Sequence, residues 1–66
     1  MNSEQTFDVW KRSQIMSKRL IATSTIKQLN QSINSGLPID QHIKNAQQYF
    51  ETDEIKLILE ETFKRQ

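Results

Sequence analysis

The chain of 66 residues contains no cysteine, one histidine, one glycine and one proline. Without cysteine there can be no disulfide, and His42 alone provides no ligand set for a structural zinc ion. A single glycine, Gly36, excludes the glycine-rich loops that cradle phosphates in nucleotide-binding proteins. We therefore expect neither a metal nor a cofactor.

Long apolar runs are also missing, because the longest cover only residues 20–22 and 57–59. Such runs are far shorter than a membrane-spanning helix, and the first twenty residues lack the apolar core of a signal peptide. The lack of cysteine fits a reducing compartment. We expect a cytoplasmic protein that does not bind membranes.

The polar residues do not form a recognisable catalytic set. Glu60 and Glu61 are adjacent and would point about 100° apart on a helix, so they cannot act as a paired acid and base. His42 has no evident partner that would position it as a general base. We therefore expect no enzyme activity and no small-molecule substrate.

The composition indicates one small domain over residues 1–66 that gains stability by association. A chain this short buries only about 60% of its unfolded surface, and 35% of its residues are hydrophobic. Residues 1–30 carry a net charge of +3 and residues 31–66 a net charge of −2, for a total of +1. This asymmetry is compatible with head-to-tail self-association and with binding to phosphate, so charge alone does not identify the partner.

Apolar periodicity predicts an all-α fold, a three-helix or helical-hairpin arrangement with helices over 6–34, 39–50 and 53–65. The alternation of apolar and polar residues typical of a strand is not sustained anywhere in the sequence. The apolar faces of the second and third helices are predicted to be Ile39, Ile43, Ala46, Phe50 and Ile55, Ile58, Leu59, Phe63. Residues 1–5 are expected to form a frayed tail.

Capping residues support these boundaries. Ser3 or Thr6 is a suitable N-cap for the first helix, and Thr52 or Asp53 for the third. Gly36 lies where a residue in the left-handed conformation closes a helix, and the following proline cannot continue it.

The first predicted helix has two apolar stripes that face different directions. Ala22, Ile26, Leu29 and Ile33 form a narrow stripe that suits a small core. In the first half, large apolar residues flank a row of small hydroxyl residues, which together form a groove. The groove residues are Val9, Trp10, Ser13, Met16, Ser17, Leu20 and Ile21. Alternatively, the helix breaks at 22–25, where helix propensity is low, and folds back so that one chain covers both stripes.

We predict that the seven groove residues bind a protein partner. A continuous helix over 6–34 would be about 43 Å long, whereas a globule of this size has a diameter of about 28 Å, so part of the helix would project. The partner would be a second copy, forming a homodimer, or a helix of a target protein. The alternative is that the third helix covers the groove as part of the chain's own core.

A second candidate surface lies on the exposed face of the second helix. Its side chains are Gln41, Lys44, Asn45 and Gln48, and a short turn precedes it, as in a helix-turn-helix. Glutamine and asparagine can read adenine in the major groove, although no arginine lies in or next to this helix. The first prediction is thus a non-enzymatic regulatory or adaptor protein acting by helix-mediated protein binding; the alternative is a small DNA-binding regulator.

Overall fold

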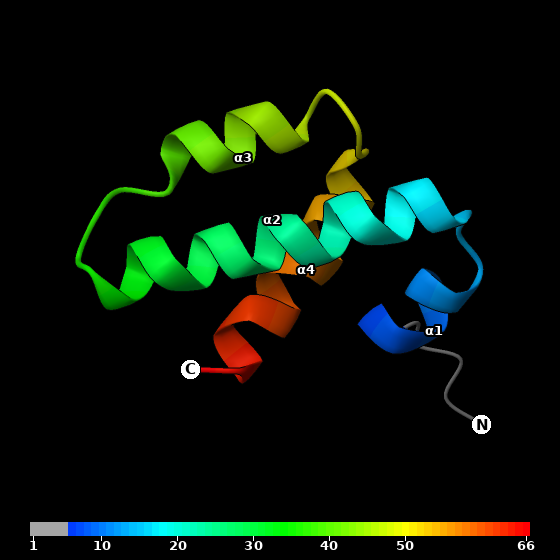
Figure 1. Cartoon of the computed structure of the whole chain (residues 1–66), viewed down its shortest axis with the longest axis horizontal. Helices are drawn as coiled ribbons and strands as arrows, with labels where there is room; N and C mark the ends of the chain where they lie inside the picture. The colour runs from blue at the N-terminus through cyan, green and yellow to red at the C-terminus, as the bar shows by residue number, and fades with distance from the viewer. Residues whose placement is uncertain (1–5) are drawn as a thin grey trace.

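The computed structural model describes residues 6–66, and this part of the chain forms four α-helices and no strand. The helices are α1 (Phe7–Arg12), α2 (Met16–Asn34), α3 (Asp40–Ala46) and α4 (Thr52–Lys64) (Figure 1). The all-helical prediction is therefore confirmed. The expected frayed tail at 1–5 and the candidate cap Ser3 lie outside the described residues.

The prediction of one continuous helix over 6–34 is wrong, because the chain turns at residues 13–15. Local hydrogen bonds stabilise this turn. The Ser13 hydroxyl donates to the carbonyl oxygen of Trp10 at 2.6 Å, and the Arg19 guanidinium donates to the carbonyl oxygens of Arg12 and Gln14 at 2.8 and 2.9 Å. These donors replace the main-chain N–H groups that a continuous helix would supply. The alternative break at 22–25 is also wrong, since α2 runs through those residues.

The turn changes how α1 packs. Its N-cap is Thr6, as predicted, and the Thr6 hydroxyl oxygen accepts a hydrogen bond from the N–H of Val9 at 3.3 Å. Phe7 and Trp10 are then buried, with ring centroids 5.7 Å apart, and Trp10 lies 5.9 Å from Phe50. The predicted projecting rod of about 43 Å is absent among the described residues, because α2 alone is about 28 Å long and α1 packs beside it.

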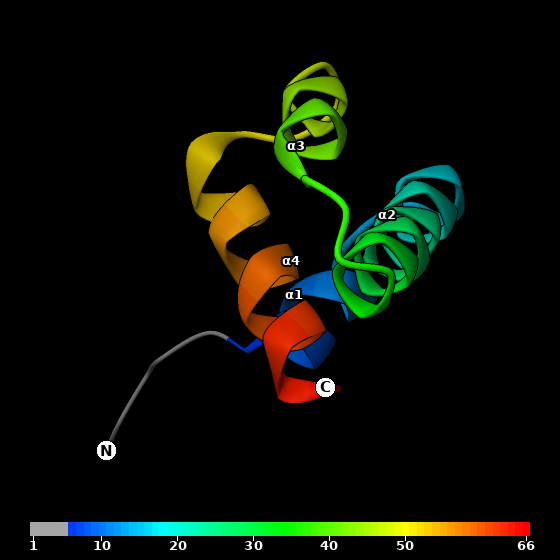
Figure 2. The ribbon, with the colours of Figure 1, turned by 90° about the vertical axis from the view of Figure 1, so that its left-hand side faces the viewer.

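α2 is the centre of the fold and contacts each of the other three helices. Figure 2 shows α2 and α4 on opposite sides, with α3 above them and α1 below. The predicted stripe of α2 faces the core, since Ala22, Ile26 and Leu29 are fully buried and Ile33 is partly buried. The buried apolar residues of the core are Phe7, Trp10, Ala22, Ile26, Leu29, Ala46, Phe50, Ile55 and Ile58.

Gly36 ends α2 as predicted. It has a φ of +71°, and its N–H donates to the carbonyl oxygen of Ile33 while the N–H of Leu37 donates to that of Ser32. This pair of bonds is a Schellman motif, which satisfies carbonyl groups at the end of a helix. The turn sends the chain back so that α3 lies beside α2 (Figure 1).

The second helix is shorter than the predicted 39–50, because α3 ends at Ala46 and residues 47–49 form a turn. Ala46 and Phe50 are nevertheless buried as predicted. The carbonyl oxygen of Ala46 accepts hydrogen bonds from the N–H groups of Tyr49 and Phe50, and this turn redirects the chain so that Phe50 enters the core.

The third predicted helix corresponds to α4, but its cap and one of its apolar residues differ from the prediction. Glu51, not Thr52 or Asp53, is the N-cap, in a reciprocal capping box with Glu54. Ile55 and Ile58 are buried, whereas Phe63 is 56% exposed and Thr62 is fully buried in its place. The Thr62 hydroxyl donates to the carbonyl oxygen of Ile58 at 2.8 Å, so this side chain is satisfied inside the core.

Candidate functional site: a hollow between α2 and α3

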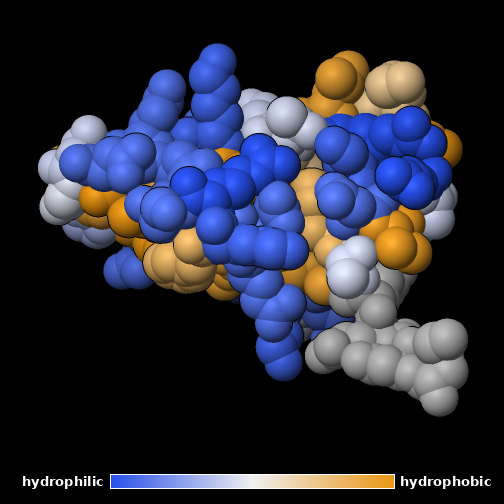
Figure 3. Space-filling model, turned by 90° about the horizontal axis from the view of Figure 1, so that it is seen from below, coloured by the Kyte–Doolittle hydropathy of each residue, from blue (hydrophilic) through white to orange (hydrophobic). Residues whose placement is uncertain are grey.

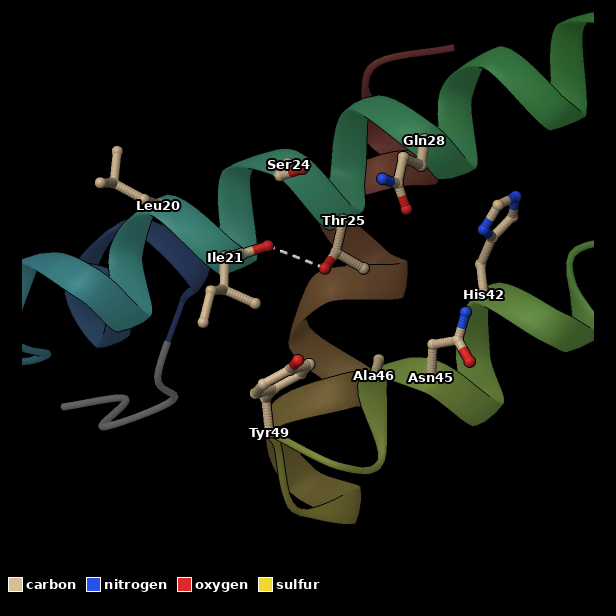
Figure 4. A pocket seen from close by; sticks show the side chains of 9 residues that line it. All are labelled: Leu20, Ile21, Ser24, Thr25, Gln28, His42, Asn45, Ala46 and Tyr49. Carbon is tan, nitrogen blue, oxygen red and sulfur yellow. Dashed lines mark hydrogen bonds between the residues drawn. The ribbon is translucent and has the colours of Figure 1, made fainter.

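A hollow among the described residues lies between α2 and α3 and has a volume of about 310 Å³ (Figure 4). This volume is at the lower end of the range for ligand pockets. Its lining comes from one face of α2, from the facing side of α3 and from the turn that follows α3. The lining residues are Leu20, Ile21, Ser24, Thr25, Gln28, His42, Asn45, Ala46 and Tyr49.

The floor of the hollow is made of small and apolar groups. Figure 4 shows Ile21 and Thr25 pointing from α2 toward α3, where Ala46 lies between Tyr49 and Asn45. The Thr25 hydroxyl donates to the carbonyl oxygen of Ile21 at 2.8 Å. The Thr25 hydroxyl proton is therefore already used in a hydrogen bond within α2 and is not available to a molecule in the hollow.

Polar side chains line the rest of the hollow. His42 Nε2 lies 2.9 Å from the hydroxyl oxygen of Ser32, and this hydrogen bond joins α3 to α2. The Gln41 amide donates to the side-chain oxygen of Asn45 at 3.0 Å. None of the nine lining residues is a lysine, arginine, aspartate or glutamate. The hollow therefore offers contact area and neutral hydrogen-bonding groups.

Large apolar side chains stand exposed along the α2 side of the hollow. Leu20 is 63% exposed and points outward at the rim in Figure 4, and Met16, one helical turn earlier, is also 63% exposed. Residues four apart lie on the same helix face, so these two side chains form one ridge. Tyr49 is exposed on the opposite rim.

The structure divides the seven predicted partner-binding residues into separate groups. Leu20 and Ile21 line the hollow, and Met16 and Ser17 are exposed on the same helix. Val9 is exposed on α1, and Ser13 lies in the turn between α1 and α2. These residues do not form the single predicted groove, because the helix that would align them is broken at 13–15.

Trp10 requires a correction, because it belongs to the core. It is only 4% exposed and packs between Phe7 and Phe50. Its indole N–H donates to the Glu54 carboxylate at 3.2 Å. A side chain held in this way is not accessible to a partner in the folded chain.

Outside the hollow, the Glu54 carboxylate is the centre of a hydrogen-bonded cluster that connects three helices, which we call the node. It accepts hydrogen bonds from Trp10 on α1, from Lys18 on α2 at 3.0 Å, and from the N–H of Glu51 at 2.9 Å. Burial raises the pKa of Glu54, but the hydrogen bonds from Glu51, Lys18 and Trp10, with the charge of Lys18, outweigh burial and hold the pKa below its usual value. This node stabilises the packing of α1.

The four residues of the DNA-binding alternative, Gln41, Lys44, Asn45 and Gln48, are exposed on α3 and the turn after it. Two of them bond to each other, since Gln41 donates to Asn45. Lys44 is the only charged residue among the four, and Asp40 on the same helix offsets it, so α3 has no net positive charge to attract DNA. DNA binding stays a prediction that no particular contact favours.

Of the residues on the α3 side of the hollow, sequence reasoning selected only Asn45, as part of the DNA-binding alternative, and it missed three α2 residues, Ser24, Thr25 and Gln28. Periodicity could place these three on one side of the long helix, but it could not show which neighbour they face. The available signal was the Gly36 turn, since a short turn between helices makes them antiparallel neighbours. That geometry brings Tyr49 back alongside Ile21.

Within residues 6–66, no group of three histidine, cysteine, aspartate or glutamate side chains is placed to hold a metal ion. In the same part of the chain, none of the helices combines the length and the apolar character needed to cross a bilayer. Comparison with protein-family models, characterised proteins and solved structures finds no match to this chain.

Proposed function

We propose that this chain is a small, non-enzymatic regulatory or adaptor protein that binds another protein chain through the α2–α3 face. The observation that carries the proposal is the exposed ridge of Leu20 and Met16 beside an uncharged hollow. Large apolar residues beside a concave surface are typical of protein interfaces, where methionine and tyrosine are enriched.

The chemistry of the face supports binding in preference to catalysis. His42 and Tyr49 are the titratable side chains of the lining, and the His42 ring is bonded to Ser32. The Ser32 hydroxyl that His42 contacts is buried and does not line the hollow, so this serine is not placed to attack a molecule bound there. As part of this proposal we place the protein in the cytoplasm, in keeping with a cysteine-free composition.

The proposal is tested with Leu20→Glu, which places a charge on the ridge without touching the core. Leu37→Glu is the matched control, because Leu37 is 59% exposed but lies in the turn after α2, outside the hollow. We expect Leu20→Glu to abolish association, with itself or with a partner, while its circular dichroism spectrum stays helical. If Leu20→Glu and Leu37→Glu associate equally with every chain bound by the wild type, the α2–α3 face is not the binding surface.

A further inference from the structure

We propose that the occupant of the α2–α3 face is a second copy of this chain, bound in a two-fold arrangement with the two α2 helices antiparallel and crossing at Ser24. This inference rests on the proposed function and specifies its partner. Three features of the face support it: a shape that complements itself, the absence of formal charge in the hollow, and a sufficient area.

The face carries a projection and a recess side by side. Leu20 points outward at the rim, next to a hollow floored by Ile21, Thr25 and Ala46 (Figure 4). A two-fold interface uses the same patch on both copies, so each patch must supply both the inserted group and its receptor. Here Leu20 of one copy would enter the part of the other copy's hollow that Gln28 and His42 line, and the reverse contact would form at the same time.

The register follows from the spacing along α2. Leu20, Ser24 and Gln28 are four residues apart and lie on the side of α2 that lines the hollow. In an antiparallel pair crossing at Ser24, Leu20 of each copy faces Gln28 of the other, and the two Ser24 side chains meet at the axis. Serine is small, so the helices can approach closely at this point, near the lower end of the usual 8–10 Å between helix axes.

Electrostatics permit two copies to meet in this way. The hollow has no lysine, arginine, aspartate or glutamate in its lining, so no like charges are buried against each other. Lys27 is exposed on α2, three residues beyond Ser24. In the proposed register the two Lys27 residues are separated by about 9 Å along the helix axis, a distance at which salt screens much of their repulsion.

The area is also sufficient. A stable interface buries about 800 Å² on each partner, roughly a sixth of the 4970 Å² accessible surface of this chain. α2 and α3 run side by side across the broad face seen in Figure 1, and the two longest dimensions of the molecule are 38 and 25 Å. A rectangle of these dimensions covers about 950 Å², so the broad side to which α2 and α3 belong is large enough for a standard interface, whereas a rectangle over the smallest side, 25 by 18 Å, covers only about 450 Å².

Figure 3 shows the molecule from below, where hydrophilic side chains cover the centre of the surface and apolar ones gather near its two ends. That side is formed by α1 and the lower part of α4, away from α3 (Figure 2). The exposed Met16 and Leu20 beside the hollow belong instead to the α2–α3 face, so we assign the second copy to that face.

A cysteine placed at Ser24 tests the register, because the chain contains no cysteine of its own. Two cysteines form a disulfide only when their Cα atoms lie about 4.4–6.8 Å apart. We expect Ser24→Cys to form disulfide-linked dimers rapidly under mild oxidation, seen on a non-reducing gel. Thr23→Cys is the matched control, because Thr23 is an exposed hydroxyl residue one position earlier that points about 100° away.

Sedimentation equilibrium of the wild type and of Leu20→Glu completes the experiment. We expect the wild type to approach twice its 7.8 kDa mass as concentration rises, Leu20→Glu to lose at least thirtyfold in self-affinity, and Leu37→Glu to behave like the wild type. Equal cross-linking of Thr23→Cys and Ser24→Cys, or a wild type that stays at 7.8 kDa into the hundreds of micromolar, would overturn the inference.

The outcomes separate this inference from the proposed function. A monomeric wild type that binds a different protein in a Leu20-dependent manner overturns the second copy as occupant and leaves the α2–α3 face as a binding surface. A wild-type dimer that Leu20→Glu does not weaken overturns both.

Discussion

The indole N–H of Trp10 donates to the Glu54 carboxylate at 3.2 Å, so a residue near the start of the chain is bonded to the first turn of the last helix. Lys18 on α2 reaches the same carboxylate at 3.0 Å. α1 has only six residues, too few for an isolated helix to be stable in water. Its conformation therefore depends on this node and on the burial of Phe7 and Trp10.

The node predicts a pH dependence of stability. Because the pKa of Glu54 is lower in the folded chain than its ordinary value of 4.5, ionised Glu54 stabilises the fold above that value. The contribution is lost as the pH falls through the folded pKa. We expect Glu54→Gln to lower the thermal unfolding midpoint at pH 7, and to lower it by less at pH 3, as followed by circular dichroism.

Glu60→Gln is the control for that measurement, because Glu60 is exposed on the same helix. Its unfolding midpoint should follow that of the wild type at both pH values. An equal loss of stability in Glu54→Gln at pH 3 and pH 7 would show that the ionised carboxylate contributes nothing.

Truncation should lower the free energy of unfolding strongly at Trp10 and hardly at all at Leu20. Trp10 is 4% exposed among aromatic neighbours, so we expect Trp10→Ala to lower the free energy of unfolding by about 3–5 kcal/mol, which is enough to unfold a marginal domain. Leu20 is 63% exposed, so Leu20→Ala should change the stability of the monomer by no more than about 0.5 kcal/mol.

Urea denaturation at low protein concentration measures both values without a contribution from association. A fully folded Trp10→Ala variant would contradict the placement of Trp10 in the core. A large loss of monomer stability in Leu20→Ala would instead place Leu20 inside the fold.

The sequence was sufficient for the features that local chemistry determines. Thr6 as a cap, the buried stripe of Ala22, Ile26 and Leu29, and the end of α2 at Gly36 follow from capping rules and from a period of 3.6 residues. Each of these features depends on residues within a few positions of one another.

The features that were predicted wrongly depend on contacts between residues far apart, or on side chains that donate hydrogen bonds to main-chain carbonyl oxygens. Nothing in periodicity shows that Arg19 bonds to the carbonyl oxygen of Arg12 and ends α1. Thr62 can occupy the core position predicted for Phe63 because its hydroxyl donates a hydrogen bond to a carbonyl oxygen within α4. The hollow also required the relative placement of α2 and α3, which a helical period does not define.

Gly36 provides a direct test of the α2–α3 turn. A Cβ at this position meets no neighbouring atom, so Gly36→Ala introduces only the conformational strain of an L-residue at a φ of +71°. We expect a loss of about 1 kcal/mol in the free energy of unfolding, measured by urea denaturation. Asn34→Ala, in the last turn of α2, is the control and should be neutral or slightly stabilising. No loss in Gly36→Ala would mean that the turn adopts another conformation.

The last prediction concerns the turn between α1 and α2. The Arg19 guanidinium donates to the carbonyl oxygens of Arg12 and Gln14, and a cation at this position also suits the C-terminal end of α1. Arg19→Ala should therefore loosen α1 locally and leave α2 and α4 intact. Hydrogen exchange followed by NMR should show faster exchange for the N–H of Trp10, which bonds to Thr6 within α1, while the N–H of Ile55 in α4 is unchanged.

Arg19→Lys separates charge from geometry in the same measurement. Lysine keeps the positive charge but lacks the planar fork that reaches two carbonyl oxygens at once. We expect its exchange rates to lie between those of the wild type and Arg19→Ala. If Arg19→Ala left exchange in α1 unchanged, the burial of Phe7 and Trp10 alone would hold the helix, and the hydrogen bonds of Arg19 would not be what sets the turn at residues 13–15.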